Sequence, residues 1–437
     1  MNKTGANTAD VIVAGGGLAG LTAATFAARA GKSVVLFEKA RELGGRAATH
    51  NEGGFLFNMG PHALYRGGAA APILAELGVA YRGTSPAASG GFAVDRGRKH
   101  ALPGGLVSLI TTSLFRLPAK LEVARLLGGL ARFDPAPQQH RTVNQWLGDA
   151  IRHPDVRRLL HMLVRVATYT NAPDTLSAGA AIRQLQLAFG SGVTYLDGGW
   201  QTLVEGLRAA AIAAGVCIES GVKVDAVEAG DAVRGVRLSN GDFFAAAAVV
   251  LTGSPNEVSA AVPEAAQTPL RRWVDESIPV RAACLDVGLA RLPQARATVA
   301  FGVDAPLYLS VHSAVAKLGP ENSATIHVAK YLPTDDDSEP GANERQLEGL
   351  LDLVQPGWRN LVQQRRFLPR MTVVHHMPTA TGGGLAGRAR ADVAGIANLY
   401  VAGDWVGSEG MLADGAVASG KAAGQLAAGS RRLSAAA

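Results

Sequence analysis

Three glycines near the start of the 437-residue chain follow the pattern Gly-x-Gly-x-x-Gly, as Gly15, Gly17 and Gly20. The first glycine permits a tight turn, the second lets the backbone approach a pyrophosphate, and the third lets a helix pack closely on a strand. Glu38 lies 18 residues after Gly20, where a carboxylate can accept the hydroxyl protons of an adenosine ribose. The spacing therefore predicts a dinucleotide-binding turn, and the alternative is a purely structural glycine turn.

A second cluster of suitable residues follows at once. Gly44 and Gly45 offer bare backbone amides, and Arg46 offers a guanidinium, to the same pyrophosphate. Lys39 stands between this cluster and the ribose-binding acid. A nicotinamide-only dehydrogenase does not need this second clamp. The alternative is a surface loop with an arginine in a salt bridge.

A third segment lies near the C-terminus, where Gly403 and Asp404 follow the apolar run 399–402 and precede a Gly- and Ala-rich helical stretch. Asp404 can hold ribityl hydroxyls or order a phosphate-bound water. The helix N-terminus can face a second charge centre, such as the N1–C2=O region of a flavin. The predicted cofactor contacts at this helix are Met411, Leu412, Ala413 and Ala416. Taken alone, the segment could be an unrelated turn, but together the three segments specify an extended FAD molecule.

The elements around the first motif predict a βαβ unit. Residues 10–14 and 33–38 are apolar runs typical of buried strands, and 18–30 is an Ala-rich helix that ends at Gly31. Leu18 and Ala19 then lie at the helix N-terminus, beside the predicted phosphates. Further helices are predicted at 102–133, 142–169, 177–189, 201–214, 344–354 and 415–428, and strands at 216–227, 233–238, 243–251, 399–402 and in several runs between 280 and 331.

The composition excludes several other classes of protein. With 48% apolar and 18% charged residues, the chain is not intrinsically disordered. Two cysteines provide neither a disulfide framework nor a Cys-x-x-Cys centre. The net charge is +6, and the basic residues are spread along the chain with no basic run interleaved with aromatics, so we expect no nucleic-acid partner. His375 and His376 could face a pocket but lack a third ligand, and we expect no metal site.

With these motifs in this order, the sequence resembles the superfamily of flavin-containing amine oxidases, protoporphyrinogen oxidases and carotenoid desaturases. Two further segments fit. Residues 57–62, Phe-Asn-Met-Gly-Pro-His, look like the segment that passes beside the flavin ring, and they add Gly60, Pro61 and His62 as expected contacts. Residues 197–200, Asp-Gly-Gly-Trp, look like the re-entry into the cofactor domain, after which Val224 would contact adenine through its backbone.

The resemblance implies an α/β fold with a Rossmann-like FAD-binding domain that is discontinuous in sequence, and an inserted α+β substrate-binding domain. We expect the FAD-binding domain at 1–85, 195–265 and 385–437, and the substrate-binding domain at 86–194 and 266–384. Amine oxidases of this group often hold FAD covalently through a Cys near the C-terminal motif. Neither Cys217 nor Cys284 is near it, so we expect noncovalent FAD.

Three residues are candidates for a role near the reacting atoms. Several relatives have a Lys that positions water near flavin N5, for which Lys330 is the candidate; the alternative is an ordinary surface Lys. His62 could touch the flavin or substrate, or be a satisfied structural His. Trp405 could lie beside the flavin, or be a core residue. Leu412 stands where amine oxidases have a cage Tyr, which disfavours small amines and favours a bulkier, lipophilic substrate.

The resemblance further implies that flavin takes a hydride equivalent from a C–H bond of a small organic molecule. One hypothesis is desaturation of a lipophilic isoprenoid-like compound; the other is oxidation of an amine or amino-acid-like intermediate; a non-catalytic FAD-binding protein is the third. We expect a cytoplasmic protein. The Leu-rich segment 106–130 carries Arg and Lys as interfacial helices do, which predicts peripheral membrane contact, although a core helix fits the pattern equally well. The oligomeric state is not predicted.

Overall fold

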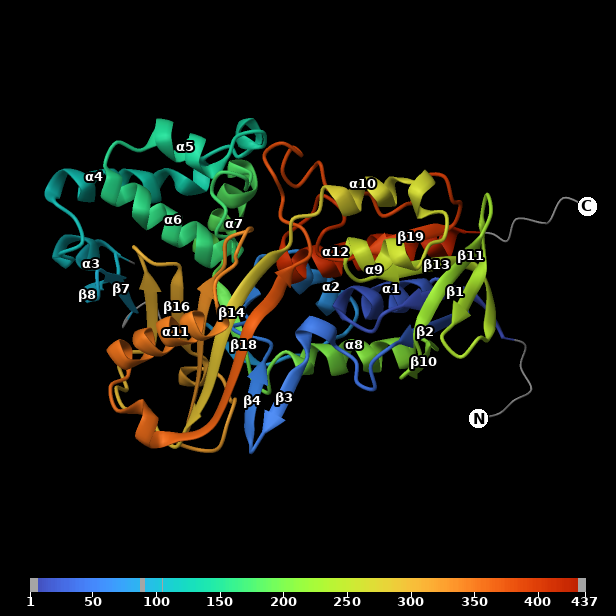
Figure 1. Cartoon of the computed structure of the whole chain (residues 1–437), viewed down its shortest axis with the longest axis horizontal. Helices are drawn as coiled ribbons and strands as arrows, with labels where there is room; N and C mark the ends of the chain where they lie inside the picture. The colour runs from blue at the N-terminus through green and yellow to red at the C-terminus, as the bar shows by residue number, and fades with distance from the viewer. Residues whose placement is uncertain (1–6, 87–90, 104, 431–437) are drawn as a thin grey trace, which may run out of the picture.

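The computed structural model describes residues 7–86, 91–103 and 105–430. Two large sheets lie at opposite ends of an elongated molecule, one beside the two chain termini and one far from them (Figure 1). Helices cover both sheets, so the fold is mixed α/β. No helix in the described part of the chain is long and apolar enough to cross a membrane.

The sheet beside the termini has the strand order β10-β2-β1-β13-β12-β11, with β19 also paired to β13. Strands β10, β2, β1, β13 and β19 run parallel, and β11 and β12 add an antiparallel edge. Three separate parts of the chain therefore build this one sheet. The strands are β1 (Thr8–Ala14), β2 (Val34–Glu38), β10 (Cys217–Ser220), β11 (Val224–Ala229), β12 (Val233–Leu238), β13 (Phe243–Thr252) and β19 (Leu399–Ala402).

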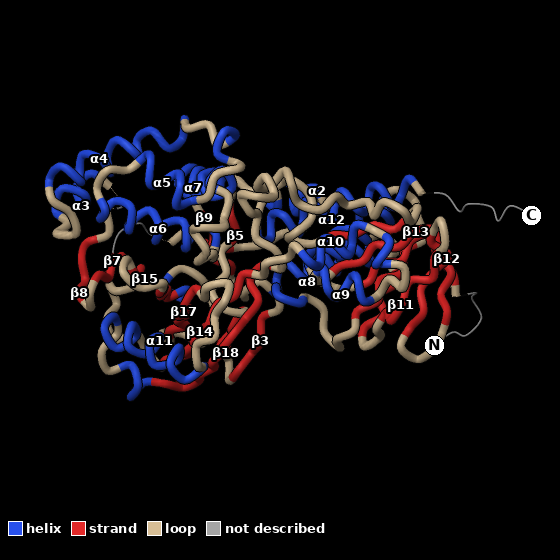
Figure 2. Tube along the Cα trace, turned by 45° about the horizontal axis from the view of Figure 1, so that its top comes forward, coloured by secondary structure: helices blue, strands red, loops and turns tan. Residues whose placement is uncertain are grey.

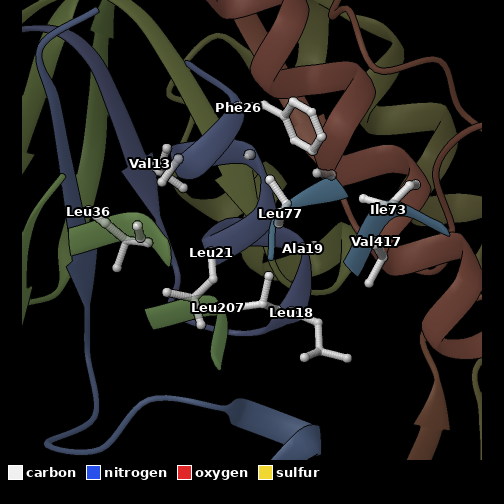
Figure 3. Packing of buried hydrophobic residues seen from close by; sticks show 14 of the residues in the cluster. Val13, Leu18, Ala19, Leu21, Phe26, Leu36, Ile73, Leu77, Leu207 and Val417 are labelled. Carbon is white, nitrogen blue, oxygen red and sulfur yellow. The ribbon is translucent and has the colours of Figure 1, made fainter. Parts of the chain in front are cut away.

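Helices on both faces explain why residues 11–14 of β1 form an unbroken apolar run, as expected for parallel strands that are buried on both sides. Val11 and Val13 face one helical layer, and Ile12 faces the other. Figure 3 shows the first layer, where Val13 of β1 and Leu207 lie around Leu21. The first layer contains α1 (Leu18–Arg29), α2 (Ala70–Glu76), α8 (Gln201–Ala213) and α12 (Leu412–Gly429). The second contains α9 (Pro255–Ala260) and α10 (Pro269–Asp275).

Glycines let α1 and α12 approach closely. A Cβ added at Gly420 would lie 2.4 Å from the carbonyl oxygen of Ala19, and one at Gly424 would lie 2.4 Å from that of Ala23. These distances are far below van der Waals contact. The Gly- and Ala-rich composition of the C-terminal helix is therefore a packing requirement, and this packing holds the two helices whose N-termini open on the cavity described below.

The second large sheet has the order β18-β14-β17-β16-β15-β7-β8 and is antiparallel except where β7 meets β15. Helix α11 (Pro340–Val354) packs on one face, and a layer of five helices lies nearby (Figure 2). The strands are β7 (Gly91–Asp95), β8 (Arg98–Ala101), β14 (Val280–Leu289), β15 (Val299–Gly302), β16 (Leu307–Val311), β17 (Ala324–Tyr331) and β18 (Val362–Val374). The layer comprises α3 (Leu106–Thr111), α4 (Leu117–Gly129), α5 (Val143–Ala150), α6 (Pro154–Thr168) and α7 (Ala178–Gly190).

Two small sheets join the large ones. The hairpin of β3 and β4 precedes the segment that enters the cavity, and β9 pairs with both β5 and β6. These strands are β3 (Thr49–Glu52), β4 (Phe55–Asn58), β5 (Leu64–Tyr65), β6 (Gly83–Thr84) and β9 (Val193–Leu196). Short 3-10 turns lie at Gly45–Ala47, Leu130–Arg132, Ala136–Gln138, Ala265–Gln267, His312–Ala314 and Trp358–Leu361.

Several predicted elements are divided in the structure. The helical segment 102–133 forms α3 and α4, and 142–169 is broken before Pro154, which begins α6 because proline fits a first helical position. The strand predicted at 216–227 is two strands, β10 and β11, with Gly221 at a positive φ of 76° between them. The predicted strands 233–238 and 399–402 match β12 and β19.

Candidate functional site

A cavity of about 710 Å³ lies along the carboxyl ends of the parallel strands of the first sheet. Ala14 at the end of β1, Thr252 at the end of β13 and Ala402 at the end of β19 all line it. This edge is where open parallel sheets bind ligands. The cavity continues past this sheet to residues of β18 and to Tyr169, so it reaches the second sheet and the helical layer beside it.

The glycine motif forms the turn between β1 and α1. Gly15 has a φ of 110°, and a Cβ added there would lie 2.1 Å from Oγ1 of Thr252. Gly17 is the N-cap of α1, and no side chain caps this helix start, which faces the cavity. A Cβ at Gly20 would lie 1.9 Å from the carbonyl oxygen of Gly15. Gly15 therefore permits the turn beside Thr252, Gly17 leaves the helix start open to the cavity, and Gly20 lets α1 approach the turn.

Glu38 ends β2 with its carboxylate at the cavity. Oε2 accepts a hydrogen bond from the Gly16 amide at 2.6 Å, and Oε1 accepts one from the Ala40 amide at 2.8 Å. Each carboxylate oxygen retains a further acceptor position, so the group can still hold two hydroxyl protons. Lys39 and Val224 line the same end of the cavity. Glu38, Lys39 and Val224, which were predicted to contact the adenosine part of the cofactor, thus lie at the same end of the cavity.

Arg46 joins the second and third sequence motifs. Its Nη1 donates to Oδ2 of Asp404 at 2.6 Å and to the carbonyl oxygen of Val373 at 2.7 Å. The turn before Arg46 requires glycine, because Gly44 and Gly45 have φ values of 124° and 54°. Both glycines, Arg46 and Asp404 line the cavity.

Asp404 is buried, and its Oδ1 has no hydrogen-bond partner among the described residues. Desolvation raises the pKa of this carboxyl, but the charge and hydrogen bond of Arg46, with His375 nearby, outweigh burial and hold the pKa below its usual value. A buried ionised oxygen without a donor is costly. A ligand hydroxyl placed in the cavity at Oδ1 would satisfy it, which fits the ribityl chain of a flavin.

A buried arginine, Arg388, braces the loop between β19 and α12. Its guanidinium donates to the carbonyl oxygens of Asp404, Gly407 and Gly410, each at 2.7 Å. Burial lowers its pKa to about 10. Sequence reasoning missed Arg388 because its partners are backbone atoms in a loop, which no residue spacing reveals.

The N-terminus of α12 is the second helix start that opens on the cavity. Leu412, Ala413 and Ala416 line it, as predicted from the third motif. Leu412 has a φ of 56°, a strained conformation for a bulky residue. Asp414 also lines the cavity, and its Oδ1 accepts a hydrogen bond from the Ala70 amide at 2.8 Å. Burial raises the pKa of Asp414 to about 6.

The end of the cavity beyond Asp404 is mainly apolar and aromatic. Its walls include Met59, Tyr65, Tyr169, Met371 and Leu412. Tyr169 ends α6 with a φ of 59°, so two bulky residues with left-handed backbones line this end. Such strain gathers at functional sites. Of these five, Leu412 was predicted from the sequence, and Met59 belongs to the segment 57–62, which was expected beside the flavin ring. Tyr65, Tyr169 and Met371 belong to no motif.

His62 also lines the cavity, with its ring edge-on to Trp200 at 4.8 Å between centroids. Its Nδ1 lies 3.0 Å from the carbonyl oxygen of Gly60, and Nε2 lies 3.1 Å from that of Arg46. Burial lowers its pKa to about 4. A neutral imidazole donates only one proton, so His62 bonds one of the two carbonyls. Pro61 lines the cavity beside it, and its carbonyl accepts from the Tyr169 hydroxyl at 2.9 Å.

Two candidates for a role near the reacting atoms lie outside the cavity lining. Lys330 in β17 donates its ammonium proton to Oδ1 of Asn343 in α11 at 2.7 Å. Trp405 is buried beside Trp273, and its indole donates to the Gly253 carbonyl oxygen at 2.8 Å. The structure contradicts both predicted placements. Lys330 is hydrogen-bonded to α11, the helix on one face of the second sheet. Trp405 belongs to the loop between β19 and α12, and its side chain points into the core.

Gly60 and Met411 lie just behind the cavity wall. Gly60 has a positive φ of 75°, which favours glycine, and a Cβ there would lie 2.8 Å from Cε of Met371. Met411 is the N-cap residue of α12 and packs with Ala180 and Leu385. His375 lines the cavity, whereas His376 accepts a hydrogen bond from the Ile278 amide. No group of three or more metal-ligating side chains occurs in the part of the chain that the structure describes.

Two uncapped helix starts, a glycine turn and a buried carboxylate paired with a partly exposed arginine surround one long cavity. They define a site for an extended anionic cofactor. Residues 18–281 match the profile of the family described as "Flavin containing amine oxidoreductase". The chain belongs to this family. It is therefore a flavin-dependent oxidoreductase.

The chain is also similar to named relatives. It is 54% identical to a carotenoid 3,4-desaturase of Haloarcula japonica over 52 residues, which is 12% of this chain and 10% of that protein. It is 25% identical to a 4,4'-diaponeurosporene oxygenase of Staphylococcus aureus over 283 residues, which is 55% of this chain and 54% of that protein. The chain therefore spans about half the length of the diaponeurosporene oxygenase that it matches. A solved oxidoreductase from Methanosarcina mazei has the same fold, with a TM-score of 0.75, 17% identity, and coverage of 94% of this chain and 99% of that chain.

Proposed function

We propose that the chain binds FAD noncovalently and uses it to oxidise a C–H bond of a bulky, lipophilic organic molecule of isoprenoid type. We infer the substrate class from the apolar and aromatic end of the cavity, which is bounded by Met59, Tyr65, Tyr169, Met371 and Leu412. The names of the two relatives, a carotenoid desaturase and a diaponeurosporene oxygenase, support such a substrate.

The cofactor assignment rests on the length of the cavity and on its chemistry. One end carries Glu38 and Val224, suited to an adenosine, and the middle carries the glycine turn and Arg46, suited to a pyrophosphate. Asp404 then offers its unpartnered Oδ1 to a ribityl hydroxyl. Noncovalent binding is proposed because neither cysteine lines the cavity: Cys217 is exposed, and Cys284 is buried behind Gly60.

Bound flavin would supply the hydride acceptor. The residues of this chain would orient the substrate and exclude water. Tyr169, fixed by its hydrogen bond to the Pro61 carbonyl, and Leu412 would fix the position of an apolar chain at the cavity end. His62 is neutral near pH 7, because burial lowers its pKa to about 4, so it would not introduce a charge beside a hydrocarbon.

The first test is the visible spectrum of the purified protein before and after acid precipitation. Flavin absorption that moves to the supernatant, identified as FAD by its mass, supports the cofactor assignment. A flavin that stays with the precipitate contradicts noncovalent binding. The second test is anaerobic mixing with acyclic polyenes in detergent micelles, where bleaching of the flavin absorption supports the substrate class.

Leu412→Tyr sharpens the substrate test, because it narrows the cavity end; since Leu412 is also a predicted cofactor contact, the flavin content of the variant is measured first. We expect kcat/KM for a polyene to fall about tenfold or more, the effect of about 1.4 kcal/mol in the transition state. Leu426→Tyr is the matched control, since Leu426 is exposed on the same helix. Equal activity of the Leu412→Tyr and wild-type proteins would contradict a role for this cavity end.

The second candidate is oxidation of an amine, and one observation favours it. Asp414 places a carboxylate in the cavity lining, and a carboxylate can pair with a substrate ammonium. This carboxylate is turned to the Ala70 amide and has a pKa of about 6, so it is a weaker partner than an ordinary Asp. Bleaching by amines and not by polyenes would support this candidate. Flavin that no polyene or amine reduces, but that dithionite does, would point to a non-catalytic flavoprotein.

A further inference from the structure

Four large apolar side chains are exposed together on α3 and α4. Val107, Ile110, Leu117 and Leu121 are 77%, 63%, 70% and 66% exposed, and all lie within residues 107–121. We call these four residues the α3–α4 patch. Both helices lie at the outer end of the molecule, far from the sheet beside the termini (Figures 1 and 2). The other large hydrophobics that are exposed in the described chain lie apart from this patch: Phe133, Phe189, Ile212, Phe243 and Leu426.

The patch is not explained by the packing of its own helices. Leu109, Phe115 and Val123 of the same segment point inward and are buried in the core of the helical layer. The exposed residues are additional to that core, and a hollow of about 230 Å³ between the two helices is lined by Ile110, Leu117 and others of the segment. A concentrated apolar surface on a monomer is typical of a docking site.

The surroundings of the patch are basic. Residues 98–132 contain six Lys and Arg residues against one acidic residue, a net charge of +5 out of +6 for the whole chain. The acidic residue, Glu122, is turned inward, where its carboxylate accepts from the amides of Arg152 and His153 at 2.7 and 3.0 Å. The exposed basic residues of this segment are Arg98, Lys99, Arg116, Arg125 and Arg132. Apolar side chains with a basic rim match the interface of a bilayer that contains anionic lipids.

We propose that the α3–α4 patch docks the protein peripherally on an anionic lipid bilayer. The patch also has a structural route to the cavity, because α4 packs on α6, and Tyr169, which lines the cavity, follows α6 directly. A lipophilic substrate would be dissolved in the bilayer, so docking would bring the cavity close to it. This role in substrate access rests on the proposed function, whereas the docking itself does not.

The test is flotation of the flavin-loaded protein with two kinds of vesicle, pure phosphatidylcholine and phosphatidylcholine with 30% phosphatidylglycerol. We expect the wild-type protein to float with the anionic vesicles at low salt, and at least tenfold less with the neutral ones or in high salt. Replacing the four patch residues by serine should reduce binding to the anionic vesicles at least tenfold. An unchanged flavin spectrum would show that this variant is folded.

The matched control replaces three exposed apolar residues elsewhere, Phe189, Ile212 and Leu426, by serine, and it should bind like wild type. Wild-type protein that does not float, or a patch variant that binds as well as the control, overturns the proposal. Dimerisation of the wild-type protein that only the patch substitutions abolish, without lipid binding, also overturns it and assigns the patch to a second copy. Each result is independent of turnover, so a failure here is distinguishable from a failure of the substrate assignment.

A depth measurement locates the contact. The exposed Cys217 is first changed to serine, and Ile110→Cys is labelled with a polarity-sensitive fluorophore; Cys284 is buried and remains unlabelled. We expect a blue shift and a rise in emission with anionic vesicles. Ile212→Cys, labelled in the same background, should show neither. Equal responses at the two positions would contradict docking through α3 and α4.

Discussion

Each large sheet contributes to a buried cluster of one Asp, one Arg and one His, and the two clusters differ in what they leave open. At the cavity, Asp404 pairs with Arg46 through Oδ2, lies near His375, and has no hydrogen-bond partner at Oδ1. The cluster in the second sheet consists of Asp286, Arg366 and His327. There both carboxylate oxygens are satisfied, by His327 Nδ1 at 2.6 Å and by Arg366 Nη2 at 2.6 Å.

The difference separates the proposed binding site from a cluster that joins two parts of the chain. Arg366 also donates to the carbonyl oxygen of Asn58, whose side chain accepts from the Trp200 amide at 2.9 Å. The closed cluster thus fastens the second sheet to the segment that leads into the cavity. Arg46, by contrast, is 35% exposed at its side chain and lines the cavity with Asp404. In the second-sheet cluster both carboxylate oxygens are paired and only His327 Nε2 lacks a partner among the described residues, whereas the cavity cluster leaves a carboxylate oxygen free for the proposed ligand.

The largest effect is expected from opening the closed cluster. Asp286→Asn removes the nearer counter-charge of the largely buried Arg366 and leaves it only Glu52, at 3.7 Å. Breaking a buried pair in this way typically costs about 3–5 kcal/mol of folding free energy. Urea unfolding of the apoprotein measures this loss of folding free energy. Asp275→Asn is the matched control, because Asp275 pairs with Arg271 on the surface and should change stability by less than about 1 kcal/mol. Equal stability of the two variants would remove the distinction between closed and exposed pairs.

A third buried carboxylate sharpens the comparison, because Asp414 has no arginine partner and burial raises its pKa from 3.8 to about 6. The folded state therefore holds its proton more tightly than the unfolded chain. The wild-type protein loses stability from this group as the pH rises from about 4 through 6, by about 3 kcal/mol for a shift of about two units. We expect Asp414→Asn to equal wild type near pH 4 and to exceed it at pH 7–8. A constant difference between the two Tm values across this range would contradict the assignment.

At the open cluster, the expected effect is on the ligand. Asp404→Asn should raise the Kd of flavin about 10- to 100-fold, because a charged acceptor with an available lone pair is lost. The stability of the apoprotein should fall less than in Asp286→Asn, since Arg46 is partly solvated. Flavin fluorescence titration and urea unfolding give the two numbers. An unchanged Kd with a large loss of stability would make this cluster a structural joint as well.

The two clusters also differ in how far the sequence predicts them. Gly15, Glu38, Arg46 and Asp404 belong to motifs whose spacing follows from backbone contacts with a phosphate chain, so the cavity's cofactor half could be predicted. Asp286, Arg366 and His327 lie on three strands, with separations of 41 and 80 residues from Asp286, and no local pattern joins them. Strand β18 was missed for the same reason, because its Gln-Gln-Arg-Arg stretch is polar and its partner strand is remote in sequence.

The placement errors have a physical cause of the same kind. Lys330 and Trp405 lie in segments that were predicted correctly as strand and post-strand loop, but their side chains point away from the cavity. Side-chain direction in a strand alternates, and a shift of one residue reverses the face. Tyr169 and Met371 line the cavity only because tertiary packing brings them there. Motif spacing therefore predicts which backbone meets a cofactor, whereas the substrate end depends on the fold.

The smallest effect is expected for the salt bridge between Lys39 Nζ and Glu257 Oε1, which are 2.7 Å apart beside the cavity. The Lys39 side chain is 62% exposed and that of Glu257 is 50% exposed. Desolvation raises the pKa of Glu257, but the Lys39 and Ser254 hydrogen bonds outweigh it and lower the pKa to about 2. The stabilisation is thus present above the unfolded pKa of about 4.5 and lost as the pH falls toward 2. Solvent screening limits it, so a double-mutant cycle of Lys39→Ala and Glu257→Ala should give a coupling below about 1 kcal/mol that shrinks in high salt. A coupling of the size expected at Asp286 would mean that burial does not decide what a charge pair contributes in this molecule.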